Sequence, residues 1–283
     1  MYGRSIVSLK VCRSRASAAL RLATVGAALA LALTCCSRSA GTGGALAREP
    51  AGSTYTLMQM NLCLSGLAGC YAKVAYPAGV EEAAGRIRDA HPDAVTINEA
   101  CRSDVAGIAR RTGYHLRFSR VIYLGAPLLC VGPGGRGLFG DAVLTKAAID
   151  SAESQDFEAQ AGIERRRWLC VSTRAHVDVC TGHLNTRTAV EVAGNDAQCA
   201  DLAALLARRA AAGTVIFGGD VNRHGSCAPD RFWTRTDASA HQAPGLQHVY
   251  GSGALRSPSA EVVPFAHSDH DVMLVRAQLS PRP

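Results

Sequence analysis

The sequence lacks several features that define large protein classes. No two cysteines have the Cys-x-x-Cys spacing of a structural zinc site, and the glycine-rich residues 132–137 lack the Gly-Lys-Ser/Thr ending of a P-loop. No internal repeat or interior linker is visible, and the apolar stretch at residues 22–33 is short for a transmembrane helix. These absences exclude zinc ribbons, P-loop nucleotidases and repeat proteins, and they argue against a membrane-spanning chain.

Acidic residues are absent from the first 47 residues, which carry six of the 30 basic residues. A basic segment, then an apolar stretch, then small and polar residues indicate a secretion signal. Residues 33–36 resemble a bacterial lipobox with Cys36 as the lipidated residue, whereas Ala45-Leu46-Ala47 is an ordinary cleavage site. We therefore predict that residues 1–47 are a secretion signal or a lipoprotein leader. The mature protein is expected to be secreted, or lipid-anchored on the outer cell surface.

The rest of the chain is nearly neutral, with 24 basic and 23 acidic residues, so the leader contributes +6 of the net charge of +7. A body with this balance lacks the electrostatic footprint of a tight polyanion binder. Aromatic residues, which could stack on bases, make up only 5% of the chain. Charge and composition therefore argue against tight nucleic-acid binding, but they leave a distributive nuclease open.

Eight cysteines follow the leader, and an even number in an exported chain indicates disulfides. Four bridges can form, and Cys63 with Cys70 is the expected local pair. The sequence leaves the other pairings open.

Strand-like segments outnumber helical ones after the leader. Helical spacing is present at residues 80–91, 104–111 and 191–212. Strands are expected at residues 56–62, 94–99, 142–145, 167–173, 176–184, 214–220, 246–250 and 271–279, with two more between 114 and 130. Hairpins mixed with β-α-β crossovers predict an α/β fold of two packed mixed sheets flanked by helices. We place this single domain at residues 53–281.

Polar residues interrupt the ends of five of these strands. The apolar residues 214–217 lead through two glycines into Asp220 and Asn222, which point the same way if the pleat persists. The other polar ends are Asn61, Glu99, His183 and Ser268-Asp269-His270. Each has a structural explanation as a turn, a solvated acid or a core histidine. Together they are the set that metal-assisted cleavage of a phosphate ester requires.

The chemistry of that reaction explains the residue types. A phosphodiester is anionic, so the attacking water must lose a proton and the developing charge must be neutralised. Oxygen ligands such as Glu99 and Asn61 suit Mg²⁺ or Mn²⁺. A histidine can act as the base because its pKa lies near working pH.

The ordered motifs resemble the endonuclease/exonuclease/phosphatase superfamily, which has the DNase I-like fold. They are Met60-Asn61, Asn98-Glu99, Thr181-Gly182-His183-Leu184, Gly219-Asp220-Val221-Asn222 and Ser268-Asp269-His270. The resemblance implies a four-layer α/β sandwich and a divalent-metal-dependent phosphoesterase. It implies that Asn61 and Glu99 hold Mg²⁺ or Mn²⁺ with help from Asp269, and that Asp220 activates water. Asn222 and His183 would contact the phosphate, and His270 would be the general base or acid.

Three positions depart from the family pattern. Asn98 stands where a glutamine is common, and Asp141 stands where an asparagine is common and could orient His183. Gln247 aligns with an aspartate that supports the catalytic histidine, here His270. Gln247 brings no charge, which leaves three alternatives. The enzyme is slower than those with the aspartate, another acid takes the place of that aspartate, or the alignment is shifted by a few residues. A binding protein that lost turnover also stays open.

The substrate class follows less directly from the residues. A phosphate ester is expected, with nuclease-like activity on nucleic acid as the first hypothesis, and we expect a monomer. A sphingomyelinase-like phosphodiesterase would need exposed apolar loops, for which Phe232-Trp233 is the candidate. Arg136 is a candidate phosphate contact. The charged residues 164–167 are interpreted as a solvated surface, with phosphate contact as the alternative.

Overall fold

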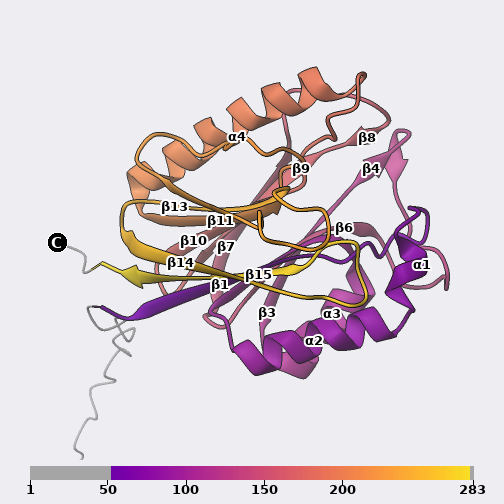
Figure 1. Cartoon of the computed structure of the whole chain (residues 1–283), viewed down its shortest axis with the longest axis horizontal. Coiled ribbons are helices and arrows are strands. Elements are labelled where there is room, and N and C mark those ends of the chain that lie inside the picture. The colour runs from indigo at the N-terminus through magenta and orange to yellow at the C-terminus, as the bar shows by residue number, and fades with distance from the viewer. Residues whose placement is uncertain (1–51, 281–283) are drawn as a thin grey trace, which may run out of the picture. The chain divides into compact units, whose positions relative to one another are not determined.

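The computed structural model describes residues 52–280 (Figure 1). The predicted leader, with Cys36, lies outside the described residues. Across residues 52–280, no helix is both long and apolar enough to cross a membrane.

Two six-stranded sheets form the centre of the domain. The first has the order β14 (Leu255–Val263), β15 (Val272–Leu279), β1 (Thr54–Asn61), β2 (Ala94–Cys101), β6 (Phe139–Thr145) and β3 (His115–Arg120). The second has the order β12 (Trp233–Thr236), β13 (Gln247–Gly251), β11 (Thr214–Asp220), β10 (Val177–Gly182), β9 (Arg167–Thr173) and β7 (Ile149–Asp156). A small third sheet contains β5 (Ala126–Pro127), β4 (Ile122–Tyr123) and β8 (Glu164–Arg165).

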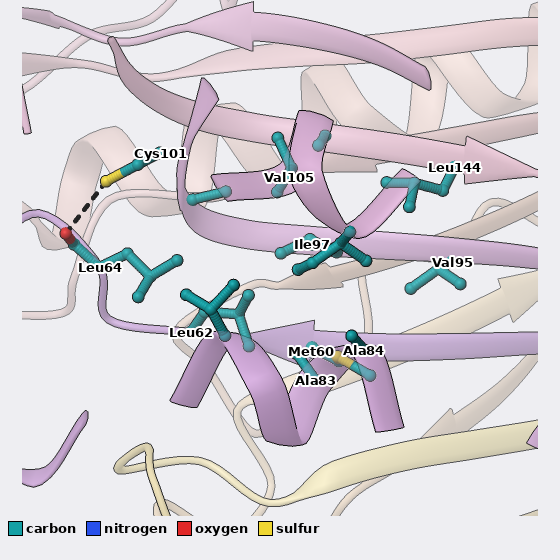
Figure 2. Close-up of a cluster of buried hydrophobic side chains, with 14 of the residues drawn as sticks. Met60, Leu62, Leu64, Ala83, Ala84, Val95, Ile97, Cys101, Val105 and Leu144 are labelled. Carbon is teal, nitrogen blue, oxygen red and sulfur yellow. Dashed lines mark hydrogen bonds between the residues drawn. The ribbon is translucent and has the colours of Figure 1, made fainter. Parts of the chain in front are cut away.

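Three apolar clusters hold the layers together. Leu57 and Val275 of the first sheet pack against Ile216 of the second, so the two sheets lie face to face. Helices α2 (Ala78–Ala90) and α3 (Arg102–Thr112) cover the other face of the first sheet, in the cluster of Figure 2. Helix α4 (Val192–Ala212) covers the second sheet (Figure 1), and helix α1 (Tyr71–Val74) is a single turn. The predicted four-layer α/β sandwich is confirmed.

The predicted elements match the structure where they are buried. The three expected helices and the hairpin of β9 and β10 are present. Strand β7 was missed because it is a mostly exposed edge strand without apolar alternation. Strand β14 was missed because it contains Pro258 at a register shift, a place where an edge strand tolerates proline.

Four disulfides join the eight cysteines of the body, and the predicted Cys63–Cys70 pair is among them. The other pairs are Cys101–Cys130, Cys170–Cys180 and Cys199–Cys227. Bridges of this number fit a protein that folds in an oxidising compartment.

The glycines before Asp220 have a packing role. A Cβ at Gly218 would lie 2.4 Å from Thr96 Oγ1 and 2.9 Å from Leu57 Cδ2, both in the opposite sheet. Only glycine permits the two sheets to approach this closely beneath Asp220.

Candidate active site

The polar strand ends meet where β1 and β2 of the first sheet face β11 of the second. Strands β1 and β2 are parallel, so Asn61 and Asn98 lie side by side and Glu99 follows. The Asn61 side-chain amide donates to Glu99 Oε1 and to Asp220 Oδ2, each at 3.0 Å. One asparagine therefore joins the acids of the two sheets.

Backbone irregularities aim two of these side chains. Strand β2 shifts register between Ile97 and Ala100, and Glu99 within that bulge has a left-handed φ of 54°. A bulge re-aims a side chain, and a left-handed glutamate costs about 1–3 kcal/mol, which proteins retain mainly at functional sites. Asn222 also has a left-handed φ, of 52°, which asparagine tolerates well.

Asp220 is the centre of the cluster. Its Oδ2 lies 3.4 Å from His270 Nε2 and 3.7 Å from His183 Nε2. Its Oδ1 accepts the backbone N–H of Asn222 at 3.0 Å. Both predicted catalytic histidines therefore reach the same carboxylate.

The turn with Asp269 is fastened to the end of β1. Ser268 Oγ donates to the carbonyl oxygen of Asn61 at 2.7 Å and accepts the N–H of His270 at 3.3 Å. A carboxylate oxygen of Asp269 and the sulfurs of Cys63 and Cys70 all lie within 4.8 Å of one another. The 63–70 disulfide therefore packs against the carboxylate of Asp269.

The donor set suits a divalent cation. Burial raises the pKa of Glu99 to about 7, the donation from Asn61 opposes the rise, and the nearby charges of Asp220 and Asp269 add to it. Three acids so close together need a positive charge if all are to be ionised. The amide oxygen of Asn61 accepts Cys63 N–H at 3.1 Å, so its amide nitrogen faces the acids. Asn61 can offer an oxygen ligand only after that amide turns.

Arg166 contacts His183, and the interpretation of residues 164–167 as a solvated surface is wrong for it. Arg166 is buried, and its Nη1 lies 2.9 Å from His183 Nδ1 and 2.7 Å from Glu164 Oε1. A guanidinium only donates, so Nδ1 accepts and the imidazole proton sits on Nε2. Burial, then the charge of Arg166, then His270 lower the pKa of His183 well below its usual value. His183 is therefore a neutral donor.

The amide of Asn222 completes this side of the site. Its nitrogen lies 3.0 Å from His183 Nε2 and donates to the carbonyl oxygen of Leu184 at 3.0 Å. In that tautomer His183 Nε2 and the Asn222 nitrogen are both donors, so they form no hydrogen bond with each other, and the bond to Leu184 is what holds the amide beside His183.

Asp141 orients Asn98, and the hypothesis that it orients His183 is wrong. Asn98 Nδ2 donates to Asp141 Oδ1 at 2.9 Å, and Asn98 Oδ1 accepts the N–H of Asp220 at 2.9 Å. Asn98 Oδ1 also accepts the side chain of Gln59 at 2.8 Å. Burial raises the pKa of Asp141 to about 7. Asn98 thus links the two sheets directly beneath Asp220.

A second acid lies behind Gln247. Both oxygens of Asp237 accept from Gln247, one from the backbone N–H and one from Nε2, each at 3.1 Å. Gln247 Nε2 also donates to the carbonyl oxygen of Asp271 at 2.7 Å, next to His270. His270 Nδ1 is buried without a hydrogen-bond partner. Burial raises the pKa of Asp237, and the Gln247 donors and the His270 charge oppose the rise.

A pocket of about 300 Å³ opens beside the cluster. Its lining is Ser65, Leu67, Ala68, Glu99, Tyr123, Leu128, Phe139, Glu164, Arg166 and His183. The candidate Arg136 does not line it: Arg136 is buried, pairs with Asp104 at 3.1 Å and stacks on two tyrosines. Phe232 and Trp233 are partly buried in the core clusters, so they form no exposed apolar loop.

Sequence reasoning missed Gln59 and Asp237, and for Arg166 it favoured a solvated surface and kept phosphate contact as the alternative. Gln59 alternates with apolar residues and resembles an outward-facing strand position, yet it is fully buried between the sheets. Arg166 lies in a charged stretch, and Asp237 lies in a segment without a strand pattern. For Gln59 alone a signal existed, because β1 is otherwise almost entirely apolar from Leu57 to Met60.

Comparisons with known proteins identify a family and a fold. The sequence profile described as the Endonuclease/Exonuclease/phosphatase family matches residues 68–270. A search of curated proteins gives no significant match.

Three solved structures illustrate the fold. Truncated TDP2 of Caenorhabditis elegans has 17% identity and a TM-score of 0.61 over 81% of this chain and 100% of that chain. An endonuclease/exonuclease/phosphatase of Beutenbergia cavernae has 18% identity and a TM-score of 0.60 over 81% and 72%. The human Nocturnin catalytic domain with bound sulfate has 15% identity and a TM-score of 0.61 over 80% and 94%. At such identities these likenesses show the DNase I-like fold alone.

Proposed function

The chain belongs to the endonuclease/exonuclease/phosphatase family, whose members hydrolyse phosphoesters, and from that premise we propose that it is an exported, divalent-metal-dependent phosphodiesterase. The observation that carries the proposal is the cluster around Asp220, which joins two histidines and the Asn61–Glu99 pair across the sheet interface. A purely structural histidine pair would not need three further carboxyl and amide groups beside it.

Glu99 and Asp269 are the residues that would hold Mg²⁺ or Mn²⁺, with Asn61 as a third ligand through its amide oxygen. A bound ion supplies positive charge that neutralises these carboxylates and the substrate phosphate. The raised pKa of Glu99, caused first by burial, supports a requirement for that charge.

The chain's own groups account for proton transfer and phosphate binding. Asp220 Oδ2 and His270 Nε2 lie 3.4 Å apart, so a single water can contact both groups. One of the two groups can accept the proton of that water as its oxygen attacks phosphorus. His183 donates Nε2–H to a phosphate oxygen, and the adjacent Asn222 amide donates a second hydrogen bond. Arg166 keeps His183 in this tautomer and adds a positive charge to the pocket wall.

Asp237 is the acid that could substitute for the aspartate that the family has at the position of Gln247. We propose that its carboxylate, held by Gln247, supports His270 by its negative charge, while Gln247 fixes the backbone carbonyl of the adjacent Asp271. The buried, unpartnered Nδ1 of His270 is the group that needs such support.

Hydrolysis of bis-p-nitrophenyl phosphate tests the function. Turnover should require Mg²⁺ or Mn²⁺ and stop with EDTA, and Asp220→Asn or His270→Ala should lower kcat about 10²- to 10⁴-fold. The exposed Asp230 and His224 provide matched controls, because Asp230→Asn and His224→Ala should leave kcat unchanged. Activity that survives chelation, or survives both site substitutions, would rule out this mechanism.

The rival is a binding protein on the same fold that has lost turnover. It predicts no rise in melting temperature with Mn²⁺, whereas the enzyme predicts a rise that Glu99→Gln abolishes. Of the two substrate classes, nucleic acid and lipid head groups, an exposed feature of the pocket mouth favours lipids.

A further inference from the structure

Exposed apolar side chains gather around the mouth of the active-site pocket. Among residues 52–280, six large apolar side chains are exposed, and five of them form what we call the apolar rim: Leu67 (60% exposed), Leu124 (70%), Leu129 (61%), Val131 (37%) and Ile163 (54%). Leu67 lines the pocket itself. Leu124, Leu129 and Ile163 each follow or precede a lining residue in the chain, and Val131 N–H donates to lining Ser65 at 2.9 Å.

Short strands and disulfides hold the apolar rim in this exposed position. Leu67 lies in the loop closed by Cys63–Cys70, and Leu129 and Val131 flank Cys130, which is bonded to Cys101. Leu124 lies between β4 and β5, and its N–H donates to the Ile163 carbonyl oxygen at 2.9 Å. Figure 1 shows α1, β4 and β8 at the same end of the domain. These bonds fix the segments that carry the exposed side chains, and a clustered apolar surface of this kind marks an interaction site.

A basic groove adjoins the apolar rim. Arg102, Arg117 and Arg120 surround a hollow of about 380 Å³ together with Leu116, Phe118 and Leu138. Leu138 pairs with Leu129 of the rim in a β-bridge, so the two features share a border. In the described structure, the three arginines form no ion pair with any carboxylate.

The near-neutral total charge conceals this local excess. Residues 102–139 contain six arginines and one acid, Asp104, which is already paired with Arg136. Arg111 pairs with Glu81, so four arginines of this segment have no carboxylate partner in the described structure. The rest of the body has 18 basic and 22 acidic residues. Positive charge is thus concentrated on the segment that carries both the groove and part of the apolar rim.

We propose that the apolar rim and the basic groove together dock the protein on an anionic lipid bilayer, with the active-site pocket facing the head groups. Leucine, valine and isoleucine partition into the interface of a bilayer, and arginines beside them bind anionic head groups. Nucleic acid fits this surface less well, because strand-binding grooves use exposed aromatic rings for stacking, whereas the rim has none and the one ring of the groove, Phe118, is half-buried. The apolar rim and the basic groove together form what we call the docking face. The proposal depends on the exposure and charge of this face, so it can be tested independently of catalysis.

Flotation with vesicles tests the docking face. The mature protein in EDTA should float with vesicles of equimolar phosphatidylcholine and phosphatidylglycerol, and less with phosphatidylcholine alone. Leu124→Ser with Leu129→Ser should weaken binding about 100-fold, since each buried leucine contributes about tenfold. Val190→Ser is the matched control, because Val190 is the exposed apolar side chain outside the rim, and it should bind as the unchanged protein does.

A second pair of variants tests the basic groove. Arg117→Gln with Arg120→Gln should weaken binding to the anionic vesicles by about fivefold per arginine, and added salt should remove the difference. The exposed Arg88 and Arg208, which form no ion pair in the described residues, provide the matched control pair.

The outcomes separate the docking face from the enzyme. Failure of the unchanged protein to float, or equal flotation of the leucine variant, would overturn the proposal. Oligonucleotide binding that the arginine pair abolishes and the leucine pair leaves intact would overturn it in favour of nucleic acid. Hydrolysis of soluble bis-p-nitrophenyl phosphate by the same preparations should be unchanged in all rim and groove variants. If the unchanged protein does not hydrolyse bis-p-nitrophenyl phosphate, the proposed phosphodiesterase activity is refuted, but the proposed membrane docking is not.

Discussion

Exchanging the carboxylate of Asp237 tests how His270 is supported. In Asp237→Asn, one oxygen that accepts from Gln247 at 3.1 Å is replaced by a nitrogen that cannot accept, and the negative charge is lost. Gln247 would then be free to turn away from the backbone beside His270. The substitution changes neither the pocket lining nor the proposed metal ligands.

The expected magnitude follows from the bond that is lost. A hydrogen bond to a charged acceptor contributes about 1.5–3 kcal/mol, which corresponds to a decrease in kcat of about 10- to 150-fold. Loss of a directly bonded orienting carboxylate costs about 10⁴-fold in a catalytic triad, so the effect through Gln247 should be smaller. The KM should change little, because Asp237 is buried away from the pocket.

Steady-state hydrolysis of bis-p-nitrophenyl phosphate with Mg²⁺ measures both constants. The double variant Asp237→Asn with Gln247→Asp returns a carboxylate to the position where the family has one, and it should recover most of the lost kcat. Asp230→Asn is the control, because Asp230 is an exposed acid outside the site.

Two results would refute this reasoning. The first is a kcat within about twofold of the unchanged protein for Asp237→Asn. The second is a loss that Gln247→Asp does not repair, which would indicate that Asp237 only stabilises the fold. Melting temperatures of all variants distinguish that second case, because a structural loss lowers the melting temperature in parallel with kcat.

Three further predictions concern the surrounding groups. Arg166→Gln should raise the KM for the diester about tenfold or more, through loss of a charged hydrogen-bond donor, whereas the exposed neighbour Arg165→Gln should not; equal KM values would remove Arg166 from the phosphate site. Burial raises the pKa of Asp141 from its usual 3.8 to about 7, so the stability gained by its protonation is complete below pH 3.8 and is lost as the pH rises through about 7. Melting scans in EDTA should therefore show a smaller loss between about pH 5 and pH 8 for Asp141→Asn than for the unchanged protein, and identical losses would contradict the burial argument. Cys63→Ser with Cys70→Ser should weaken the Mn²⁺-induced melting shift by about tenfold in apparent affinity, because the disulfide packs against a proposed ligand; an unaltered titration would show that the bridge acts on stability alone.

The order of the polar motifs was readable from the sequence because each adjoins an apolar run with strand periodicity. Asn61 and Asp220 end β1 and β11, and His183 follows β10 directly. Glu99 lies two residues before the end of β2, and His270 lies two residues before the start of β15. Periodicity depends only on local burial, so it located the strands and helices that the core covers. It could not locate β7, whose side chains are mostly exposed, or β12, a short edge strand.

The contacts among those motifs depended on the tertiary structure. Asn98 differs from the common glutamine by one methylene, and only the packed sheets show that it joins Asp141 to the backbone of Asp220. Two arginines have other roles than the sequence predicted. Arg136, the expected phosphate contact, packs on tyrosines, and Arg166, expected on a solvated surface, contacts His183. The residues next to an arginine in the sequence do not distinguish one that packs on tyrosines from one that contacts a site histidine.

The sequence by itself determined the family, the layer order and the identity of the main polar groups, because hydrophobic periodicity and motif order are local properties of the chain. The tertiary structure decided which acid bonds to Gln247, which arginine enters the pocket and where the surplus positive charge lies. Those outcomes depend on side chains that are distant in the sequence and that the packed sheets bring together. The spacing of residues along the chain does not give the distances between these side chains, because those distances are determined only when the sheets pack.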